Sequence, residues 1–558
     1  MDDVLRTAIT DTLKDLELDE VDFSVEHPAE VSHGDYSSNV AMVLAKHVGE
    51  APREVAEQIV EKLDGAIEHV DRIEIAGPGF INFFLTRDFF VQELGHVSEK
   101  EWGRTDDLKD EVIMFEYTSP NLFKPLHIGN LVGNIIGESV TRLLENAGAD
   151  VKRINYPSDI GLTVAKGVWG LKKTGGNPDT IADLGEAYKK GNEAYENDST
   201  AKEEIEAVNR ALYAEDDERL NELRERGITT SRTHLKELLR TLGTSFDLVV
   251  FESEASPVGK KTVEDHVADG IFEESDGAIV FKGERHGLHT RVFLNSQGLP
   301  TYEAKDVGNF ILKQRAYPEW TQSIVVTGQE QREYFKVIIA AVRELFPEAE
   351  DKALEHIPTG FLTLTTGKMS SRKGNVLTGE SLIAEVRKEA EKRAKESRAE
   401  DVEVLSEQIA VAALKYQILR QKIGSDIVFD KERALSFEGD SGPYLQYTHA
   451  RIGSVLEKAK EVGVEASLQH APETPYALEH ILYQYPEVVR EATGEKEPHR
   501  IVGYLTELAG AFNTFYAQEK IADASDEYAS YKVALAEAVK VTLKNGLHLL
   551  GIEAPERM

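Results

Sequence analysis

The stretch TSPNLFKPLHIGNL, residues 118–131, interrupts its backbone with two prolines and then gathers His127, Gly129 and Asn130 ahead of a run of helix formers. The run IMFEY before it, ending at Tyr117, reads as a buried strand, and LVGNIIGESVTRLLENAG after it reads as a helix. A strand, a tight turn and a helix N-terminus form an anion site, because free N–H groups and the helix dipole point the same way. The stretch predicts either a phosphate-binding turn or a helix that His127 merely caps, with Gly129 relieving packing.

The region around this stretch alternates short apolar runs with helical patterns from about residue 105 to 395. The apolar runs are EVIMFEY, VKRIN, SIVVTG and FLTLTTG, and their alternation with helices predicts parallel strands in an α/β sheet. Within this region, residues from about 175 to 240 are charged and helical and contain no strand signal. We therefore predict an α/β domain over 105–395 that carries a helical insertion.

The two flanking regions differ from the central region in their patterns of apolar residues. Residues 1–100 hold helical stretches and the segment VDRIEIAGPGFINFFL, whose alternating apolar residues predict two strands joined by a turn at Gly77-Pro78-Gly79. Residues 396–558 show apolar spacings of three and four almost throughout, as in YLTELAGAFNTFYAQ. These patterns predict an α+β domain at the N-terminus and an all-α bundle at the C-terminus.

Composition limits the classes of function. The 558 residues include 64 Lys and Arg against 99 Asp and Glu, and 64 − 99 gives a net charge of −35, which argues against a general nucleic-acid binder but not against a local basic patch. With Cys 0 and no paired-histidine motif, a structural zinc site is not expected. No apolar stretch approaches the roughly 20 residues that span a bilayer, and no export signal is visible. We expect a cytoplasmic protein that does not insert into a membrane.

A second stretch changes the interpretation of the first. TTGKMSSRKGNVL, residues 365–377, places Lys368, Arg372 and Lys373 among serines and glycines after the apolar run FLTL. Small residues give backbone freedom and cations give charge, so this composition favours a loop that binds polyphosphate. The simpler alternative is a solvated basic loop.

Together the two stretches resemble the HIGH and KMSKS signatures of the class I aminoacyl-tRNA synthetases, in that family's order and at its long separation. The finer resemblance, over nearly the whole chain, is to the arginyl-tRNA synthetases. The segments that carry it are GDYSSNVAMVLAK, GPGFINFFL, SPNLFKPLHIGNL, NYPSDIGL, SFDLVVFESE, LPTYEAKDVGNF, GQEQREYF, GPYLQYTHARI, LAGAFNTFY and GIEAPERM.

The resemblance implies a Rossmann-type catalytic domain, an N-terminal added domain that contacts tRNA and a C-terminal anticodon-binding domain. It implies a reaction in two steps: the carboxylate of L-arginine attacks the α-phosphate of ATP, and the arginyl group then passes to a ribose hydroxyl of the tRNA's terminal adenosine. The expected substrates are ATP with Mg²⁺, L-arginine and the arginine tRNA. No zinc or organic cofactor is expected, and we expect a monomer.

The resemblance also assigns the phosphate side of the site. His127, Asn130, Lys368 and Lys124 would be catalytic, and the ATP contacts would be Pro120, His127, Gly129, Met369, Ser370 and Arg372. Two positions depart from the family signatures: Asn130 replaces the second histidine of HIGH, and Ser371 replaces the second lysine of KMSKS. Lys124 would supply the missing charge; the alternative is that it is a solvated turn residue.

Selecting arginine requires acidic and polar groups around a planar guanidinium. Tyr302 and Asp306 are four residues apart in TYEAKD and would share one helix face. By resemblance the arginine-binding residues would be Asn121, Glu116, Tyr302, Asp306, Gln331 and Glu252. The tRNA-binding residues would be Tyr516, Arg451, Tyr447, Asp35 and Asn39.

Two alternatives remain open at this point. The first is a related synthetase for another amino acid, such as a cysteinyl or glutamyl enzyme; the absence of cysteine removes the usual cysteinyl zinc site, and Tyr302 with Asp306 favours a cationic substrate. The second is a tRNA-binding module without catalysis. The presence of His127, Gly129 and Lys368 argues against that reading.

Overall fold

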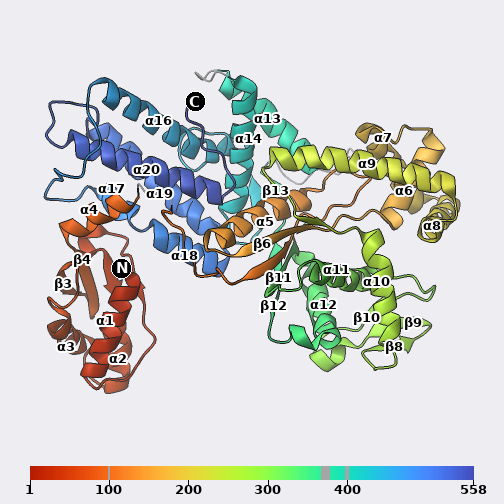
Figure 1. The fold of residues 1–558 in the computed structure, drawn as a ribbon, viewed down its shortest axis with the longest axis horizontal. Helices are drawn as coiled ribbons and strands as arrows, with labels where there is room; N and C mark the ends of the chain where they lie inside the picture. Colours follow the sequence, from red (N-terminus) through yellow and green to blue (C-terminus); the bar gives the residue numbers. More distant parts are fainter. Residues whose placement is uncertain (98–100, 366–377, 396–400) are drawn as a thin grey trace.

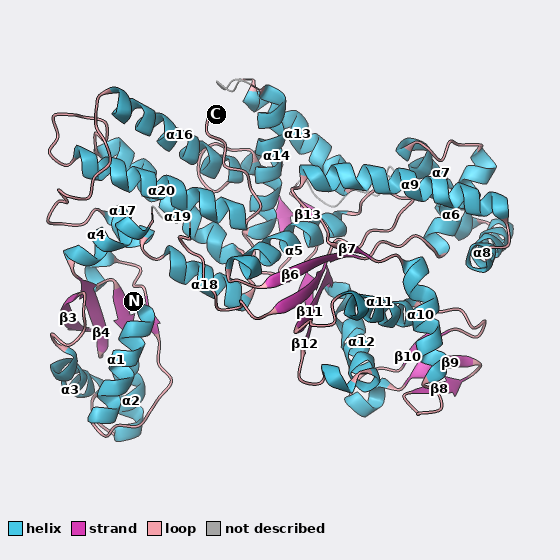
Figure 2. Ribbon diagram, viewed as in Figure 1, coloured by secondary structure: helices cyan, strands magenta, loops and turns pink. Residues whose placement is uncertain are grey.

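The computed structural model describes residues 1–97, 101–365, 378–395 and 401–558. It contains a small N-terminal domain, a central parallel sheet with its covering helices, a helical insertion on one side and a helical bundle on the other (Figures 1 and 2). This arrangement confirms the predicted fold class. Among the helices of the described residues, none has the length and apolar character needed to cross a bilayer.

The N-terminal domain packs helices on an antiparallel sheet with strand order β1-β2-β4-β3. The predicted turn joins β3 to β4, where Gly77 and Gly79 take φ of 53° and 134°, and Ile81 and Phe83 point into the core at 0% exposure. The elements are α1 (Asp2–Asp15), β1 (Val25–Glu26), β2 (Tyr36–Ser38), α2 (Val40–Val48), α3 (Pro52–Leu63), β3 (Val70–Ala76), β4 (Phe80–Leu85) and α4 (Arg87–His96).

The central sheet is parallel, with strand order β12-β11-β5-β6-β7. Helix α5 connects β5 to β6 and is buried on most of its surface, because the sheet lies on one side of it and the C-terminal bundle on the other. The elements are β5 (Val112–Glu116), α5 (Ile128–Asn146), β6 (Asp150–Asn155), β7 (Leu248–Val249), α10 (Glu252–Asp265), α11 (Tyr302–Ala316), β11 (Gln322–Gly328), α12 (Arg332–Leu345) and β12 (Ala353–Thr359).

The prediction that FLTL is a strand of the central sheet is wrong. The run forms β13 (Leu362–Leu364), which pairs in parallel with β14 (Ile427–Phe429) in a separate two-stranded sheet. The edge strand of the central sheet is instead β12, which contains Glu355 and Pro358. An edge strand tolerates proline because one side of its backbone needs no partner, and this polar, proline-containing run lacks the apolar signal of a buried strand.

The insertion consists of α6 (Leu162–Thr174), α7 (Ile181–Asn197), α8 (Ser199–Ala214) and α9 (Glu218–Thr241). These helices bury a core of their own that includes Leu184, Ile205 and Leu212. Helix α9 extends from the insertion back to the sheet (Figure 1). A small antiparallel sheet that the sequence did not predict follows α10, formed by β8 (Phe272–Ser275), β9 (Ala278–Phe281) and β10 (Arg291–Leu294).

The C-terminal bundle shares one hydrophobic core with the central domain. That core runs from Ile113 and Phe115 on β5, through Leu131 and Ile135 on α5, to Leu547 on the last helix. The helices on this side are α13 (Gly379–Ala394), α14 (Val402–Leu419), α15 (Lys431–Ala434), α16 (Gly442–Glu461), α17 (Ala477–Leu482), α18 (Tyr485–Glu495), α19 (His499–Gln518) and α20 (Ala529–Leu549).

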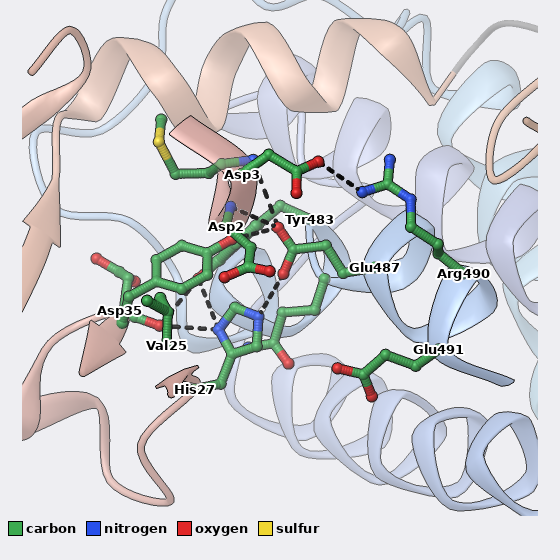
Figure 3. A network of polar contacts seen from close by, with 12 residues as sticks. Asp2, Asp3, Val25, His27, Asp35, Tyr483, Glu487, Arg490 and Glu491 are labelled. Atoms are coloured by element: carbon green, nitrogen blue, oxygen red, sulfur yellow. Dashed lines mark hydrogen bonds and ion pairs between the residues drawn. The ribbon is translucent and has the colours of Figure 1, made fainter. Parts of the chain in front are cut away.

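The N-terminal domain is joined to this bundle by a polar junction centred on Glu487 of α18 (Figure 3). The Glu487 carboxylate accepts a hydrogen bond from the Tyr36 hydroxyl at 2.6 Å and contacts His27 Nε2 at 2.9 Å. Burial alone would raise the pKa of Glu487, but the hydrogen bonds with His27 and Tyr36 lower it to about 2. A salt bridge of 2.9 Å between Arg490 and Asp3 lies beside this junction.

Candidate active site

The turn between β5 and α5 is conformationally strained. Thr118, Ser119 and Phe123 have φ of 76°, 34° and 67°, values that residues other than glycine rarely adopt. The Asn130 amide donates to the Thr118 carbonyl at 2.7 Å, and the Asn134 amide donates to the Thr118 hydroxyl at 3.0 Å. The Asn130 amide therefore holds the turn, and its contact with ATP stays a prediction.

The insertion holds the same turn from the other side. The Phe123 ring is fully buried, and a Cβ at Gly167 of α6 or Gly227 of α9 would lie 2.7 Å and 2.3 Å from it. The Phe123 N–H donates to the Ser231 hydroxyl of α9 at 3.2 Å. Because only glycine leaves room for this ring, the insertion helices fix the position of the turn.

His127 caps α5, and this capping also prepares its ring for a ligand. Its Nδ1 accepts a hydrogen bond from the Gly129 N–H at 3.1 Å, which places the proton of the neutral ring on Nε2. Partial burial and the charge on Lys124 lower the pKa of His127, against an opposing effect of Glu330. A neutral imidazole with an N–H donor on its outer side can hydrogen-bond a phosphate oxygen. The capping and phosphate-binding interpretations are thus compatible.

The segment that follows the second motif lies against the first motif. Thr378, the first described residue after that motif, forms an antiparallel bridge with His127. The Gly379 N–H donates to the Leu126 carbonyl at 2.8 Å, and the Leu126 N–H donates to the Glu380 carboxylate at 2.9 Å. The motif residues Lys368, Met369, Ser370, Ser371 and Arg372 lie outside the described residues.

Lys124 is half-buried in the same turn, next to buried Pro120. Burial and the nearby Lys166 lower its pKa, and its ammonium lies 5.9 Å from the centroid of the Tyr188 ring. Within the described chain no carboxylate lies at ion-pair distance from Lys124. Because it is half-buried, Lys124 is not a solvated turn residue. A half-buried cation without a counter-ion is suited to receive an anionic ligand.

Three of the predicted arginine-binding carboxylates gather at the carboxyl edge of the sheet. Glu116 ends β5, Glu252 begins α10 and Asp306 lies in the first turns of α11. Glu116 and Asp306 line one cavity together with Asn309 and Lys313. The charges on Glu116 and Glu252 both raise the pKa of Asp306, as expected for three acids in one place.

The three carboxylates differ in their partners. Lys313 Nζ lies 2.6 Å from Glu116, and Lys305 Nζ lies 2.9 Å from Glu252, so each of these acids is neutralised by a buried lysine. Asp306 instead accepts a hydrogen bond from the Tyr334 hydroxyl. Burial raises the pKa of Asp306 to about 8, with help from the two other acids and against the Tyr334 hydrogen bond and Lys313.

Polar atoms around these acids are left without partners. Within the described residues, Ser119 Oγ, Tyr156 Oη and Asn309 Oδ1 are buried and make no hydrogen bond. The pKa of Tyr156 is raised by burial and then by Asp306, Glu252 and Glu116, which puts its ring beside the acidic group. Buried polar atoms are normally satisfied. Asn309 lines the cavity of Glu116 and Asp306, and Tyr156 lies near the same acids, so these two atoms without partners indicate a place for a polar ligand.

The sequence prediction missed Tyr156, Tyr334, Asn309 and the two neutralising lysines. A signal for two of them existed, because Asn309 and Lys313 follow Asp306 at spacings of three and seven, on one helix face. Nothing local pointed to Tyr334 of α12, which reaches Asp306 only through the fold.

The remaining arginine candidates lie at the margin. Tyr302, at the start of α11, is 60% exposed, with the Lys305 ammonium 5.1 Å from its ring centroid. Gln331 is exposed in the turn before α12. Asn121 is half-buried and bridges to Ser158 after β6.

Comparisons with known proteins agree on one family. The family model described as "tRNA synthetases class I (R), catalytic domain" matches residues 95–431, "DALR anticodon binding domain" matches 445–558, and "Arginyl tRNA synthetase N terminal domain" matches 3–85. The chain belongs to the arginyl-tRNA synthetases. The catalytic match runs past the predicted boundary at 395 and includes β14.

Individual relatives align with nearly the whole chain. The chain is 32% identical to the arginine–tRNA ligase of Treponema denticola over 567 residues, 96% of this chain and 95% of that one. It is 32% identical to the arginine–tRNA ligase of Archaeoglobus fulgidus over 549 residues, 95% and 96% of the two chains. Among solved structures, it is similar to the arginyl-tRNA synthetase of Thermus thermophilus, with a TM-score of 0.80, 26% identity and full coverage of both chains.

The predicted anticodon-domain residues of this synthetase meet on one surface. The guanidinium of Arg451 lies 4.7 Å from the ring centroid of Tyr447 and 5.8 Å from that of Tyr516, which is 45% exposed. Phe512 and Phe515 are core residues at 0% and 6% exposure. Whether the surface binds the tRNA anticodon stays a prediction.

In the N-terminal domain the prediction for Asp35 is contradicted. Asp35 is buried, accepts from the Leu85 N–H at 2.8 Å and pairs with His480 of α17 at 2.6 Å, so it joins two domains and does not face tRNA. Asn39 is half-buried, and its side-chain oxygen accepts from the Ser24 N–H at 2.9 Å. Its contact with tRNA stays a prediction.

Proposed function

We propose that this chain attaches L-arginine to its tRNA in two steps at the site between the 118–130 turn and the carboxyl edge of the sheet. The observation that supports this most is the arrangement of acids around Asp306. Two of the three carboxylates are neutralised by lysines, whereas within the described residues Asp306 has the Tyr334 hydroxyl as its hydrogen-bond partner and no cation at ion-pair distance. Asp306 is therefore the group left to bind an added cation, and a guanidinium fits it by charge and planarity.

In the first step the carboxylate of arginine attacks the α-phosphate of ATP, bound as its Mg²⁺ complex, and pyrophosphate leaves. The protein supplies no nucleophile; it positions the reactants and stabilises charge on the phosphates. His127 would donate from Nε2 to a phosphate oxygen. Lys124, which has no ion-pair partner among the described residues, would place its ammonium near the developing pyrophosphate. Lys368 would act with them from the second motif.

In the second step a ribose hydroxyl of the tRNA's terminal adenosine attacks the arginyl carbonyl and AMP leaves. Glu116 and Glu252, held by their lysines, would shape the arginine pocket around Asp306. Asn121 and Gln331 would hold the amino and carboxylate ends of arginine. No zinc or organic cofactor enters this scheme, and among the described residues no group of three or more His, Cys, Asp or Glu side chains is arranged to hold a metal ion. We propose that the enzyme works as a cytosolic monomer.

The test is aminoacylation of a tRNA pool with each amino acid in turn. Arginine alone should be attached; charging with another amino acid, or none, would overturn the proposal. For Lys124, the Lys124→Ala variant should lower the rate of adenylate formation, measured with tRNA present, by about a hundredfold. Lys190→Ala, an exposed lysine on α7, is the matched control, and an unchanged rate in Lys124→Ala would remove Lys124 from the scheme.

A further inference from the structure

The last three turns of α9 present a row of exposed cations. Arg232, Lys236 and Arg240 are all exposed and follow one another at four-residue spacing. Each step along this row turns by about 40° and rises about 6 Å, so the three side chains form a line about 12 Å long on one flank of the helix. The opposite flank holds His234, which pairs with Glu380 at 3.2 Å.

The three cations of this row belong to a strongly acidic chain. Within the described residues, no carboxylate lies at ion-pair distance from any of its three cations, although acids outnumber cations 99 to 64 in the chain. Earlier on the same helix, Arg224 and Arg226 pair with Asp159 and Asp179 at 2.7 Å and 2.6 Å. Like charges at i and i+4 repel and destabilise a helix, so within the described residues the row gains no attraction that would explain it apart from the contact of Arg232 with the Phe251 ring.

One end of the row lies at the rim of the active site. The guanidinium carbon of Arg232 lies 4.8 Å from the ring centroid of Phe251, the residue before Glu252. The neighbouring Ser231 accepts the hydrogen bond from Phe123 in the strained turn. From this rim α9 continues along the sheet toward the C-terminal bundle (Figure 1).

We propose that Arg232, Lys236 and Arg240 bind the backbone phosphates of the tRNA strand that leads to the terminal adenosine. This inference rests on the proposed aminoacylation, because the reaction requires the terminal ribose to enter the site past the rim that Arg232 occupies. A net charge of −35 repels a polyanion, so the strand needs a local line of cations at the point where it leaves the site. Lysine and arginine on a helix face bind phosphates without reading base identity.

The experiment uses the full chain with all three cations changed: Arg232→Gln, Lys236→Gln and Arg240→Gln. The control triple Arg219→Gln, Arg315→Gln and Lys388→Gln removes the same charge from exposed positions on three different helices. The KM for tRNA in aminoacylation should rise about tenfold in the row variant and less than twofold in the control. The slope of log affinity for tRNA against log salt should fall in magnitude by about two in the row variant only.

A second variant separates charge from structure. This triple variant keeps the three charges and should retain the KM for tRNA and the salt slope; its substitutions are Arg232→Lys, Lys236→Arg and Arg240→Lys. The KM for arginine should stay unchanged in all variants, and kcat at saturating tRNA should persist. A tRNA KM within twofold of the unsubstituted enzyme in the row variant, or an equal rise in the control triple, overturns the proposal. A failure of aminoacylation itself would appear separately, as no arginine charging by the unsubstituted chain.

Discussion

Two half-buried carboxylates in this molecule have opposite electrostatic character. Glu487, at the junction of the N-terminal domain and the bundle, is hydrogen-bonded by His27 and Tyr36, and its pKa falls to about 2. Asp306, at the edge of the central sheet, has the Tyr334 hydroxyl as its partner among unsatisfied neighbours, and its pKa rises to about 8. The first carboxylate has all the partners it needs within the protein. The second has no cation at ion-pair distance among the described residues, which is typical of a ligand site rather than of an interface.

The largest effect is expected from Asp306→Asn. Removing the carboxylate leaves the guanidinium of arginine without its counter-charge, so the KM for arginine should rise by about a hundredfold to a thousandfold. The KM for ATP should change little. Because Asp306 is held protonated in the empty site, the same change should raise the thermal midpoint of the arginine-free protein. A lowered midpoint with an unchanged KM for arginine would make Asp306 a structural residue.

The pH dependence of arginine binding is the second test. The Asp306 carboxyl is neutral below its pKa of about 8 and must lose its proton to bind a cation. The Kd for arginine should therefore rise by about tenfold for each pH unit below 8, and calorimetry at pH 7 in buffers of different ionisation enthalpy should detect about one proton released. Asp306→Asn should give a flat profile between pH 6 and 8. A flat profile in the unsubstituted enzyme would contradict the assignment.

Glu487→Gln should act on stability and not on substrate. The Glu487 carboxylate is half-buried and accepts from Tyr36, His27 and the backbone nitrogens of Met1 and Asp2. Its loss should cost about 2 kcal/mol, seen as faster hydrogen exchange in β4 at the junction. The pKa of Glu487 is lowered on folding, so its contribution is present above the ordinary glutamate pKa of 4.5 and is lost as pH falls from there toward 2. The difference between variant and unsubstituted protein should vanish at low pH. An altered KM for arginine would show that the two carboxylates are coupled.

The smallest expected effect comes from a matched pair of tyrosines. Tyr156→Phe removes a hydroxyl without a partner in the described residues, so it should leave stability unchanged or slightly higher and raise the KM for arginine about fivefold. Tyr36→Phe removes a hydroxyl bonded to Glu487, so it should lower stability by about 1 kcal/mol and leave the KM for arginine alone. If Tyr36→Phe instead raised the KM for arginine and Tyr156→Phe lowered stability, Tyr36 would belong to the ligand site and Tyr156 to the structural core.

The sequence predicted what depends on local pattern and on family signatures. The hairpin at Gly77–Gly79, the turn at 118–131 and the gathering of Glu116, Glu252 and Asp306 were all readable in this way. Two kinds of feature were not. The edge strand β12 was hidden because edge strands need neither apolar runs nor freedom from proline, and Tyr334 and Asp35 acquire their partners from segments distant in the sequence. Asp35 shows the limit most clearly, since a polar residue in a family segment became a buried link between domains.

The core shared by α5 and the C-terminal bundle has a consequence for how the molecule can be divided. Helix α5, capped by His127, packs against α14, α18 and α20. Cutting the chain near residue 400 would expose that apolar surface, so the central domain and the bundle should melt as one cooperative unit in calorimetry. The N-terminal domain has a core built almost wholly from its own residues and can open first. The N-terminal domain can therefore be exchanged between relatives with little change to its core. Exchange of the C-terminal bundle requires a redesigned α5 surface.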